Sequence, residues 1–303
     1  AKANFKRLCE EVPLKPDTEE NLYVYSLKMG EHTQIGIAGA ASVADYDADI
    51  IKKHEKTRKD KEDDRARHVM ELRSHSGPVF LTYRDSDKIN AVVAEIMKGK
   101  PYFDFTAPDG IVHKLWKAGA EKSKVLASLF AKEVPCFYIA DGHHRAASAS
   151  RAGAQCRKSD PNHTGKEDYN YFLAVTFPAS QLRILPYNRV VKDLNGLSSA
   201  ELIKKIEERF TVNPSKSASP SKSGEFCMYL DGKWSLVAPK FDINKLGVIE
   251  RLDVSVLQDN ILAPLLGIDD PRTSKRIDFV GGIRGTGELV KLVDSGKAKI
   301  AFS

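Results

Sequence analysis

Stretches that alternate apolar and polar residues, typical of strands, are interspersed along the chain with stretches of helical period. Residues 22–29 and 34–38 alternate on either side of a turn that begins at Gly30, which predicts a hairpin. Residues 87–97 carry apolar side chains at positions 89, 92, 93 and 96, which form one face of a helix. Further strands are predicted at residues 78–83, 102–105, 111–116, 171–177, 226–230 and 233–237, and further helices at residues 59–73, 121–130, 198–210, 254–266 and 288–293. This mixture of strands and helices predicts an α/β (α+β) fold around a mixed sheet.

The character of the chain changes near Asn195-Gly196, which suggests two parts. A connection rich in Ser, Lys and Pro follows at residues 214–224. We therefore expect a core domain over residues 1–196 and a smaller C-terminal α+β region over residues 197–303. The first residue is Ala1 rather than Met, and the last ones resemble a strand that stops midway. We accordingly expect polypeptide to be missing from one or both ends.

Composition is that of an ordinary globular protein, with 42% hydrophobic and 29% charged residues. The apolar runs are only as long as strands, and the start of the chain does not resemble a signal peptide, so we expect no membrane partner. The four cysteines form no paired C-x-x-C signature, which argues against a zinc knuckle or a disulfide framework and favours the reducing cytoplasm. The net charge of +6 suits small polyanions such as phosphates as well as nucleic acid.

The segment Asp141-Gly142-His143-His144-Arg145 follows an apolar stretch and precedes residues rich in Ala and Ser, a pattern of strand, tight turn and helix. A glycine at such a turn lets the backbone approach a ligand, and the first turn of a helix favours an anion. The imidazoles and the guanidinium add donors suited to phosphate. Asp141 can coordinate Mg²⁺ or act as a base. The alternative is that Asp141 caps the helix and that the histidines are surface polar groups.

A second polar cluster begins with His54-Glu55-Lys56-Thr57. Glu55 is a candidate general base for a hydroxyl, and Lys61 and Arg65 lie one helical turn apart, where they can face one anion together. The alternative is a solvated, highly charged helix. The loop at residues 281–285 lacks the Lys-Ser/Thr ending of a Walker motif, and no Rossmann fingerprint precedes it. The adjacent histidines 143 and 144 lack the spacing of a transition-metal site.

Several motifs, taken in order, resemble a family known only as a conserved domain of unknown function. They are His54-Glu55-Lys56-Thr57 with Lys61-Glu62-Asp63-Asp64-Arg65, Asp109-Gly110 with His113 and Leu115-Trp116, Ile139-Ala140-Asp141-Gly142-His143-His144-Arg145, Leu185-Pro186-Tyr187-Asn188-Arg189, and Asp270-Pro271-Arg272 with Asp278-Phe279-Val280-Gly281-Gly282-Ile283-Arg284-Gly285. The His-His-Arg segment resembles the phosphate-binding motif of the ParB/sulfiredoxin superfamily. That superfamily includes nucleotide-hydrolysing partition proteins, sulfiredoxins and kinases of free L-serine.

Some members of the resembled family are described as serine kinases that use pyrophosphate. The resemblance implies a ParB/sulfiredoxin-like phosphate-binding core and a small-molecule kinase that converts L-serine to O-phospho-L-serine, with Mg²⁺ as cofactor and pyrophosphate or a nucleotide as donor. It implies catalytic roles for Glu55, Asp141 and His143, with Asp141 also holding the metal. The implied phosphate ligands are Gly142, His144, Arg145, Lys61 and Arg65, and the implied substrate contacts are His54, Thr57, Asn188 and Arg189.

Other functions are weighed against this one. A nucleotide-dependent DNA-binding protein of the partition type is disfavoured because strands and a polar loop, instead of a helix-turn-helix, follow the motif. The basic residues of this chain are also interspersed with acidic ones and form no single stripe, so we do not expect a nucleic-acid partner. A sulfiredoxin-like reductase needs a reactive cysteine in the motif, whereas we expect Cys136 inside a buried strand and Cys156 beyond the helix. A non-catalytic sensor of a phosphorylated metabolite stays open, as does the oligomeric state.

Overall fold

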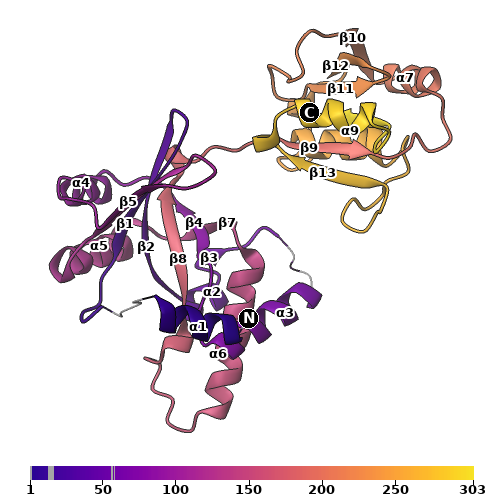
Figure 1. Ribbon diagram of the computed structural model, residues 1–303. Coiled ribbons are helices and arrows are strands. Elements are labelled where there is room, and N and C mark those ends of the chain that lie inside the picture. Colours follow the sequence, from indigo (N-terminus) through magenta and orange to yellow (C-terminus); the bar gives the residue numbers. More distant parts are fainter. Residues whose placement is uncertain (1, 13–16, 56, 58) are drawn as a thin grey trace. The chain divides into compact units, whose positions relative to one another are not determined.

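The computed structural model describes residues 2–12, 17–55, 57 and 59–303, and the chain divides into two compact units, Ala1–Leu182 and Arg183–Ser303. Each unit has its own sheet with helices against it, which confirms the predicted α/β class (Figure 1). In the described part of the chain, no helix combines the length and the apolar character that crossing a bilayer requires.

The first unit is built on a mixed sheet of eight strands in the order β3-β7-β4-β8-β2-β1-β6-β5. The strands are β1 (Tyr23–Met29), β2 (His32–Ser42), β3 (Ile51–Lys52), β4 (Val79–Tyr83), β5 (Phe103–Thr106), β6 (Val112–Lys117), β7 (Phe137–Asp141) and β8 (Tyr171–Pro178). Strand β3 runs parallel to β7, and β4 runs parallel to β8, while the other neighbours are antiparallel. The predicted hairpin at the start of the chain is confirmed as β1 and β2.

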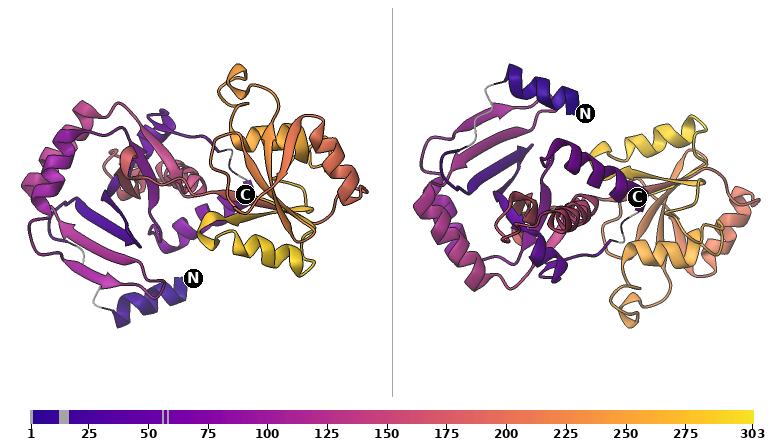
Figure 2. Two further views of the ribbon diagram at one scale, coloured as in Figure 1. Left: turned by 90° about the horizontal axis from the view of Figure 1, so that it is seen from above. Right: turned by 90° about the horizontal axis from the view of Figure 1, so that it is seen from below.

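The helices of the first unit form two groups. They are α1 (Lys2–Glu11), α2 (Val43–Asp47), α3 (Lys59–Leu72), α4 (Asp87–Ile96), α5 (Ala120–Glu133) and α6 (His143–Ser159). Helix α4 packs on α5, and their residues Ile89 and Leu126 share a core with Trp116 of the sheet. Helix α3 packs along α6 (Figure 2). The small residues Ala146 and Ala149 of α6 lie in a second core with strand residues, so this helix approaches the sheet closely, as its composition suggested.

The second unit is built on an antiparallel sheet in the order β10-β12-β11-β14-β9-β13. Its strands are β9 (Tyr187–Val191), β10 (Phe210–Pro214), β11 (Phe226–Leu230), β12 (Lys233–Pro239), β13 (Ile277–Gly281) and β14 (Ile300–Phe302). Its helices are α7 (Ser199–Glu207), α8 (Asp253–Leu257), which continues as a π-helical turn over Gln258–Leu262, and α9 (Gly287–Asp294). Neighbouring residues Val190 and Val191 enter different cores, so helices cover both faces of this sheet.

The division between the units precedes β9. This strand pairs with β13 and β14, so its residues belong to the second unit, whereas the sequence suggested a boundary near residue 196. The signal used for that boundary is a local one. Asn195 and Gly196 both have a positive φ, of 56° and 80°, and make a turn between β9 and α7 inside the second unit. A turn within a domain and a linker between domains share the same residue types, because both require unusual backbone angles.

Candidate functional site

The strand-turn-helix predicted around Gly142 is present in the first unit. Strand β7 ends at Asp141, and α6 begins at His143. Gly142 is the N-cap of α6, with a φ of +96° in the left-handed region that favours glycine. It makes no side-chain capping bond. The start of α6 therefore combines the positive end of the helix dipole with a cap that lacks a side chain.

A cavity of about 550 Å³ opens at the start of α6. The β7–α6 turn contributes residues 141–145, and the next turn of the helix adds Ser148. The wall opposite comes from α3 and from the loop between α3 and β4. This wall consists of Arg65, His68, Val69, His75, Ser76 and Gly77, and Glu55 lines the cavity as well. The cavity thus gathers two guanidinium groups, four imidazoles and two carboxylates from four separate segments.

Arg145 connects the two walls. Its Nη2 donates to Asp141 Oδ2 at 2.5 Å, one helical turn back. A Cβ added to Gly142 would lie 2.8 Å from Nε of Arg145, and one added to Gly77 would lie 3.3 Å from its Nη1. The Arg145 guanidinium therefore lies against Gly142 on one wall and Gly77 on the other, and the absence of a Cβ at both positions leaves space for it.

His143 and Glu55 form a pair. The Nδ1 of His143 lies 3.2 Å from Oε2 of Glu55, and the His143 side chain is only 3% exposed, against 54% for Glu55. Burial, assisted by His54, lowers the pKa of His143, although Glu55 and Asp141 oppose the shift. The ring of His54 meets that of His143 edge to face at 4.4 Å between centroids. Nδ1 of His143 therefore faces the Glu55 carboxylate, and this contact links the start of α6 to the segment before α3.

The other ring nitrogen of His143 is an exception among buried polar atoms. Its Nε2 is buried and has no hydrogen-bond partner among the residues that the structure describes. Buried polar atoms are nearly always paired, with protein groups or with ordered water. An orphaned atom beside a polar cavity is typical of a site that binds a ligand or water.

Four polar residues of the cavity were not among the sequence-based candidates: His68, His75, Ser76 and Ser148. His68 Nε2 lies 3.2 Å from the hydroxyl of Ser76, which links α3 to the loop that follows it. His75 Nε2 lies 3.1 Å from the carbonyl oxygen of Tyr171, and burial lowers the pKa of His75. The spacing of Arg65 and His68, three apart on a predicted helix, was the available signal, since residues at that spacing share a face.

The remaining predicted residues of the first unit that the structure describes do not line the cavity. Thr57 donates its hydroxyl hydrogen to the carboxylate of Glu62, and His54 contacts His143. Lys61 is exposed on α3 and, unlike Arg65, is not part of the cavity wall. Lys56 of the same motif lies outside the described residues.

Asn188 and Arg189 lie on β9 in the second unit. Asn188 is buried, and its Oδ1 has no hydrogen-bond partner in the described part of the chain. The Arg189 guanidinium carbon lies 5.6 Å from the ring centroid of Tyr187 and 5.5 Å from that of Phe279, and burial lowers the pKa of this guanidinium. Both residues line a cavity of about 620 Å³ that belongs to the second unit.

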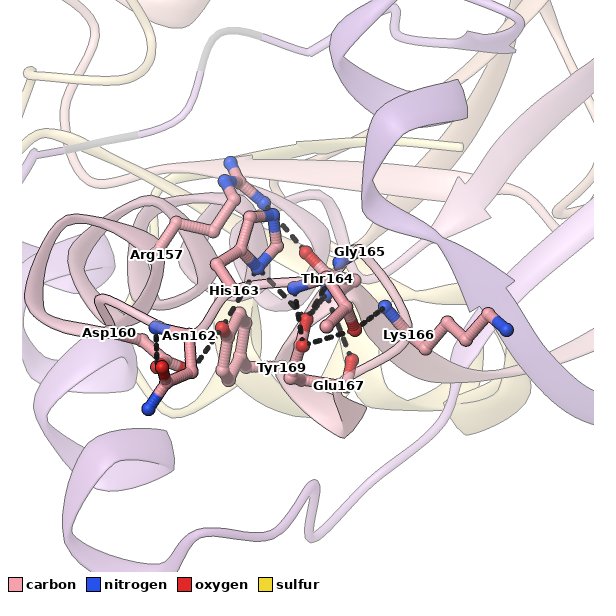
Figure 3. Close-up of polar contacts among 10 residues, drawn as sticks. Arg157, Asp160, Asn162, His163, Thr164, Gly165, Lys166, Glu167 and Tyr169 are labelled. Carbon is pink, nitrogen blue, oxygen red and sulfur yellow. Dashed lines mark hydrogen bonds and ion pairs between the residues drawn. The ribbon is translucent and has the colours of Figure 1, made fainter.

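The loop after α6 holds a separate polar network around Glu167 (Figure 3). Glu167 accepts hydrogen bonds from the hydroxyl and backbone N–H of Thr164 and from the N–H of Gly165, at 2.6, 2.7 and 3.0 Å. These bonds, the Thr164 hydroxyl foremost, hold the pKa of Glu167 well below its usual range. His163 lies 2.9 Å from Glu167 and 2.9 Å from the hydroxyl of Tyr169. Because this network follows the C-terminal end of α6, His163 is not a residue of the cavity.

The donor set of the cavity suits a metal that is held jointly with phosphate. Within the described part of the chain, no group of three or more His, Cys, Asp or Glu side chains is placed to hold a metal ion. Mg²⁺ does not need such a group, because one or two carboxylates together with substrate phosphates and water are its usual ligands. Asp141, whose side chain is 74% exposed at the cavity, fits that mode of binding.

The comparisons with known proteins place the chain in one family. A family model described as Protein of unknown function (DUF1015) matches residues 1–255, and the chain belongs to that family. Comparisons with the curated proteins and with the solved structures gave no match.

Proposed function

We propose that this member of the DUF1015 family is a small-molecule kinase that transfers a phosphoryl group to the hydroxyl of free L-serine, giving O-phospho-L-serine. The observation that carries the proposal is the cavity at the start of α6, which Arg65, Arg145 and four histidines line together with the carboxylate of Glu55. Phosphoryl transfer needs cations around the transferred group and an aligned hydroxyl, and little covalent help from the protein. Serine as acceptor and pyrophosphate as donor follow from the resemblance of the His-His-Arg motif to the ParB/sulfiredoxin superfamily.

The start of α6 is the proposed site of the transferred phosphoryl group. Gly142 allows close approach of the backbone, and the dipole of α6 favours negative charge at this end. His144 and Arg145 line the cavity at the same place and add donors. Asp141 would hold Mg²⁺ together with phosphate oxygens, and the ion when bound supplies positive charge against the charge of the phosphates.

Glu55 is the proposed base, and His143 is the residue that orients it. The serine oxygen attacks the terminal phosphorus of pyrophosphate, and a new O–P bond forms as the bond from that phosphorus to the bridging oxygen breaks. Inorganic phosphate leaves, and the hydroxyl proton passes to Glu55. The 3.2 Å contact of His143 Nδ1 with Oε2 leaves the other carboxylate oxygen to meet the hydroxyl. His54 supports the His143 ring, and Thr57, Asn188 and Arg189 remain predicted substrate contacts.

Phosphorus NMR tests this function directly. The protein is incubated with Mg²⁺, L-serine and, in separate tubes, pyrophosphate, ATP and ADP, and we expect O-phosphoserine in at least one tube. Glu55→Gln should slow its formation by about a hundredfold or more, the usual contribution of a general base. Glu95→Gln is the matched control, because Glu95 is an exposed carboxylate on α4 paired with Lys122. No O-phosphoserine in any tube, or a fully active Glu55→Gln variant, would contradict the proposal.

A further inference from the structure

Arg151 of α6 connects this helix to α3 outside the cavity. It follows His143 by about two helical turns, and it is not one of the residues that line the cavity. We infer that Arg151 is a positioning residue for Glu55, because it holds the segment of chain that carries this carboxylate. The inference rests on the proposed function in taking Glu55 as the base, and it adds a residue that lies outside the motifs of the sequence.

Glu55 lies on the connection between β3 and α3. Strand β3 ends at Lys52, and α3 begins at Lys59. The Glu55 side chain is half exposed, and its Oε2 contacts Nδ1 of His143 at 3.2 Å. A general base must stay within hydrogen-bond reach of the proton that it removes. The position of Glu55 therefore depends on the side chains that connect this segment to the helices.

Glu62 of α3 is shared between this segment and Arg151. Its Oε1 accepts the hydroxyl hydrogen of Thr57, and its Oε2 lies 3.3 Å from Nη1 of Arg151. The Glu62 side chain is only 19% exposed, so most of its surface is withdrawn from water. Thr57 follows Glu55 by two residues. A fixed Glu62 carboxylate therefore restricts the positions that Glu55 can adopt.

The guanidinium of Arg151 is suited to fixing Glu62, because it is a planar fork with several donors. Its Nη2 lies 2.5 Å from Oδ1 of Asp63, while its Nη1 faces Glu62. One group thus binds two consecutive carboxylates of α3, the helix that packs along α6 (Figure 2). Ion pairs at a protein surface contribute little to stability, but two contacts from one rigid fork also fix direction.

These contacts form a closed path that begins and ends on α6. His143 meets Glu55 at the start of the helix, and Arg151 meets Glu62, which in turn holds Thr57. The two ends of the path are about 12 Å apart along the helix axis, at about 1.5 Å per residue. A segment that is held at two separate points of one helix is restrained against turning about either contact. The Glu55 carboxylate therefore stays at the start of α6.

A double-mutant cycle in turnover distinguishes positioning from a general loss of stability. Arg151→Gln should lower kcat by about tenfold to a hundredfold, the effect of a small misplacement of a reacting group, and leave the KM for the donor nearly unchanged. In a Glu55→Gln background the same change should have almost no further effect, because the base that it positions is absent. Arg157→Gln is the matched control, because Arg157 is another arginine of α6 and pairs with Asp47 of α2. It should keep the wild-type kcat.

Nitrogen NMR of His143 tests the same role without turnover. Its Nδ1 lies 3.2 Å from Oε2 of Glu55, so the chemical shift of Nδ1, at one pH at which the ring is neutral, reports on the carboxylate. Arg151→Gln should move this signal in the same direction as Glu55→Gln does, and Arg157→Gln should leave it in place. Glu62→Ala breaks the path in the middle and should act as Arg151→Gln does, which preserves the test if one variant fails to fold.

Two results would overturn the inference. One is a wild-type Nδ1 signal in Glu55→Gln or in the folded Arg151→Gln and Glu62→Ala variants, and the other is an additive loss of kcat in the double variant. If the signal moves as expected while the wild type forms no O-phosphoserine, Arg151 positions Glu55 and the kinase proposal fails. If O-phosphoserine forms and Arg151→Gln has the wild-type kcat and signal, the kinase proposal stands and the positioning role fails.

Discussion

Replacing Gly142 by alanine separates the structural from the functional role of the α6 turn. Gly142 has a φ of +96°, and an L-residue in left-handed backbone costs about 1–2 kcal/mol. The added Cβ would also lie 2.8 Å from Nε and 2.9 Å from Nη2 of Arg145. These atoms belong to the far end of a flexible side chain, so displacing them costs little stability. It does, however, remove the guanidinium from the place where we expect it to contact phosphate.

The expected stability loss lowers the thermal midpoint of the first unit by roughly 2–8 °C, taking about 2–4 °C per kcal/mol for a unit of this size. Loss of a charge-assisted contact of about 1.5–3 kcal/mol lowers phosphate affinity by about tenfold to a hundredfold. Scanning calorimetry measures the first quantity, and isothermal titration with inorganic phosphate measures the second.

Two other glycines provide controls. Gly110 has a φ of +84° with no atom within 4 Å of an added Cβ, so Gly110→Ala should lose similar stability and keep full phosphate affinity. An added Cβ at Gly77 would lie 3.3 Å from Nη1 of Arg145 without left-handed backbone, so Gly77→Ala should keep stability and lose affinity. If Gly142→Ala loses stability but binds phosphate as the wild type does, Arg145 is not a phosphate ligand and our reading of the turn is wrong.

Two further predictions concern pH and packing. Burial lowers the pKa of His75 and of His143 from the ordinary value of 6.5, so the unfolded chain binds more protons than the native one below about pH 7. We therefore expect the urea midpoint of unfolding to fall as the pH is lowered from 7.5 to 5.5. The His75→Gln variant should show a smaller fall of the midpoint over the same pH range. A midpoint that rises as the pH is lowered would contradict this assignment to the buried histidines. Replacing a glycine inside a helix by alanine normally stabilises the protein by up to about 1 kcal/mol. Gly153→Ala in α6 should instead lower the urea midpoint, because the added Cβ would lie 2.6 Å from the carbonyl oxygen of Tyr169. An unchanged or higher midpoint would show that the loop yields at little cost.

Local sequence signals predicted the elements that local chemistry determines. The turn at Gly30 identified the β1–β2 hairpin, and the strands predicted at residues 226–230 and 233–237 pair as β11 and β12. The helix predicted from residue 198 has Ser198 as its N-cap, whose hydroxyl accepts from the N–H of Glu201. The predicted helix at 198–210 ends early, because Phe210 is buried at the start of β10 and pairs there with Pro239. The predicted helix at 254–266 is one turn of α-helix followed by a π-helical turn. Neither change has a signal in hydrophobic periodicity.

Local sequence patterns also predicted only the part of the candidate site that is contiguous in the sequence. Gly142 and the residues after it were found because five suitable residues are consecutive in the sequence. The charge pattern of α3 is that of a solvated helix, and this describes Arg67, whose exposed side chain pairs with Asp64. Arg65 is exposed as well, but it lines the cavity together with the half-buried His68. Which side of α3 faces α6 depends on tertiary packing, and the helix has few apolar residues to mark that side. His75 depends on a carbonyl 96 positions away, which no local pattern can reveal.

The order of strands in the first sheet bears on how the cavity arises during folding. The β1–β2 and β5–β6 hairpins close over a few residues, whereas β4 pairs in parallel with β8, and Thr82 donates to the oxygen of Phe177 over 95 positions. Closing so long a loop costs more conformational entropy than closing a hairpin, and the pairing of β4 with β8 is therefore expected to form later. The cavity lies where the start of β4 meets the end of β7, and His75 of its wall bonds to the carbonyl oxygen of Tyr171, the first residue of β8. A nascent chain that has not yet released β8 from the ribosome therefore has its hairpins but cannot yet hold His75 in place, and anion binding should appear only after that strand emerges.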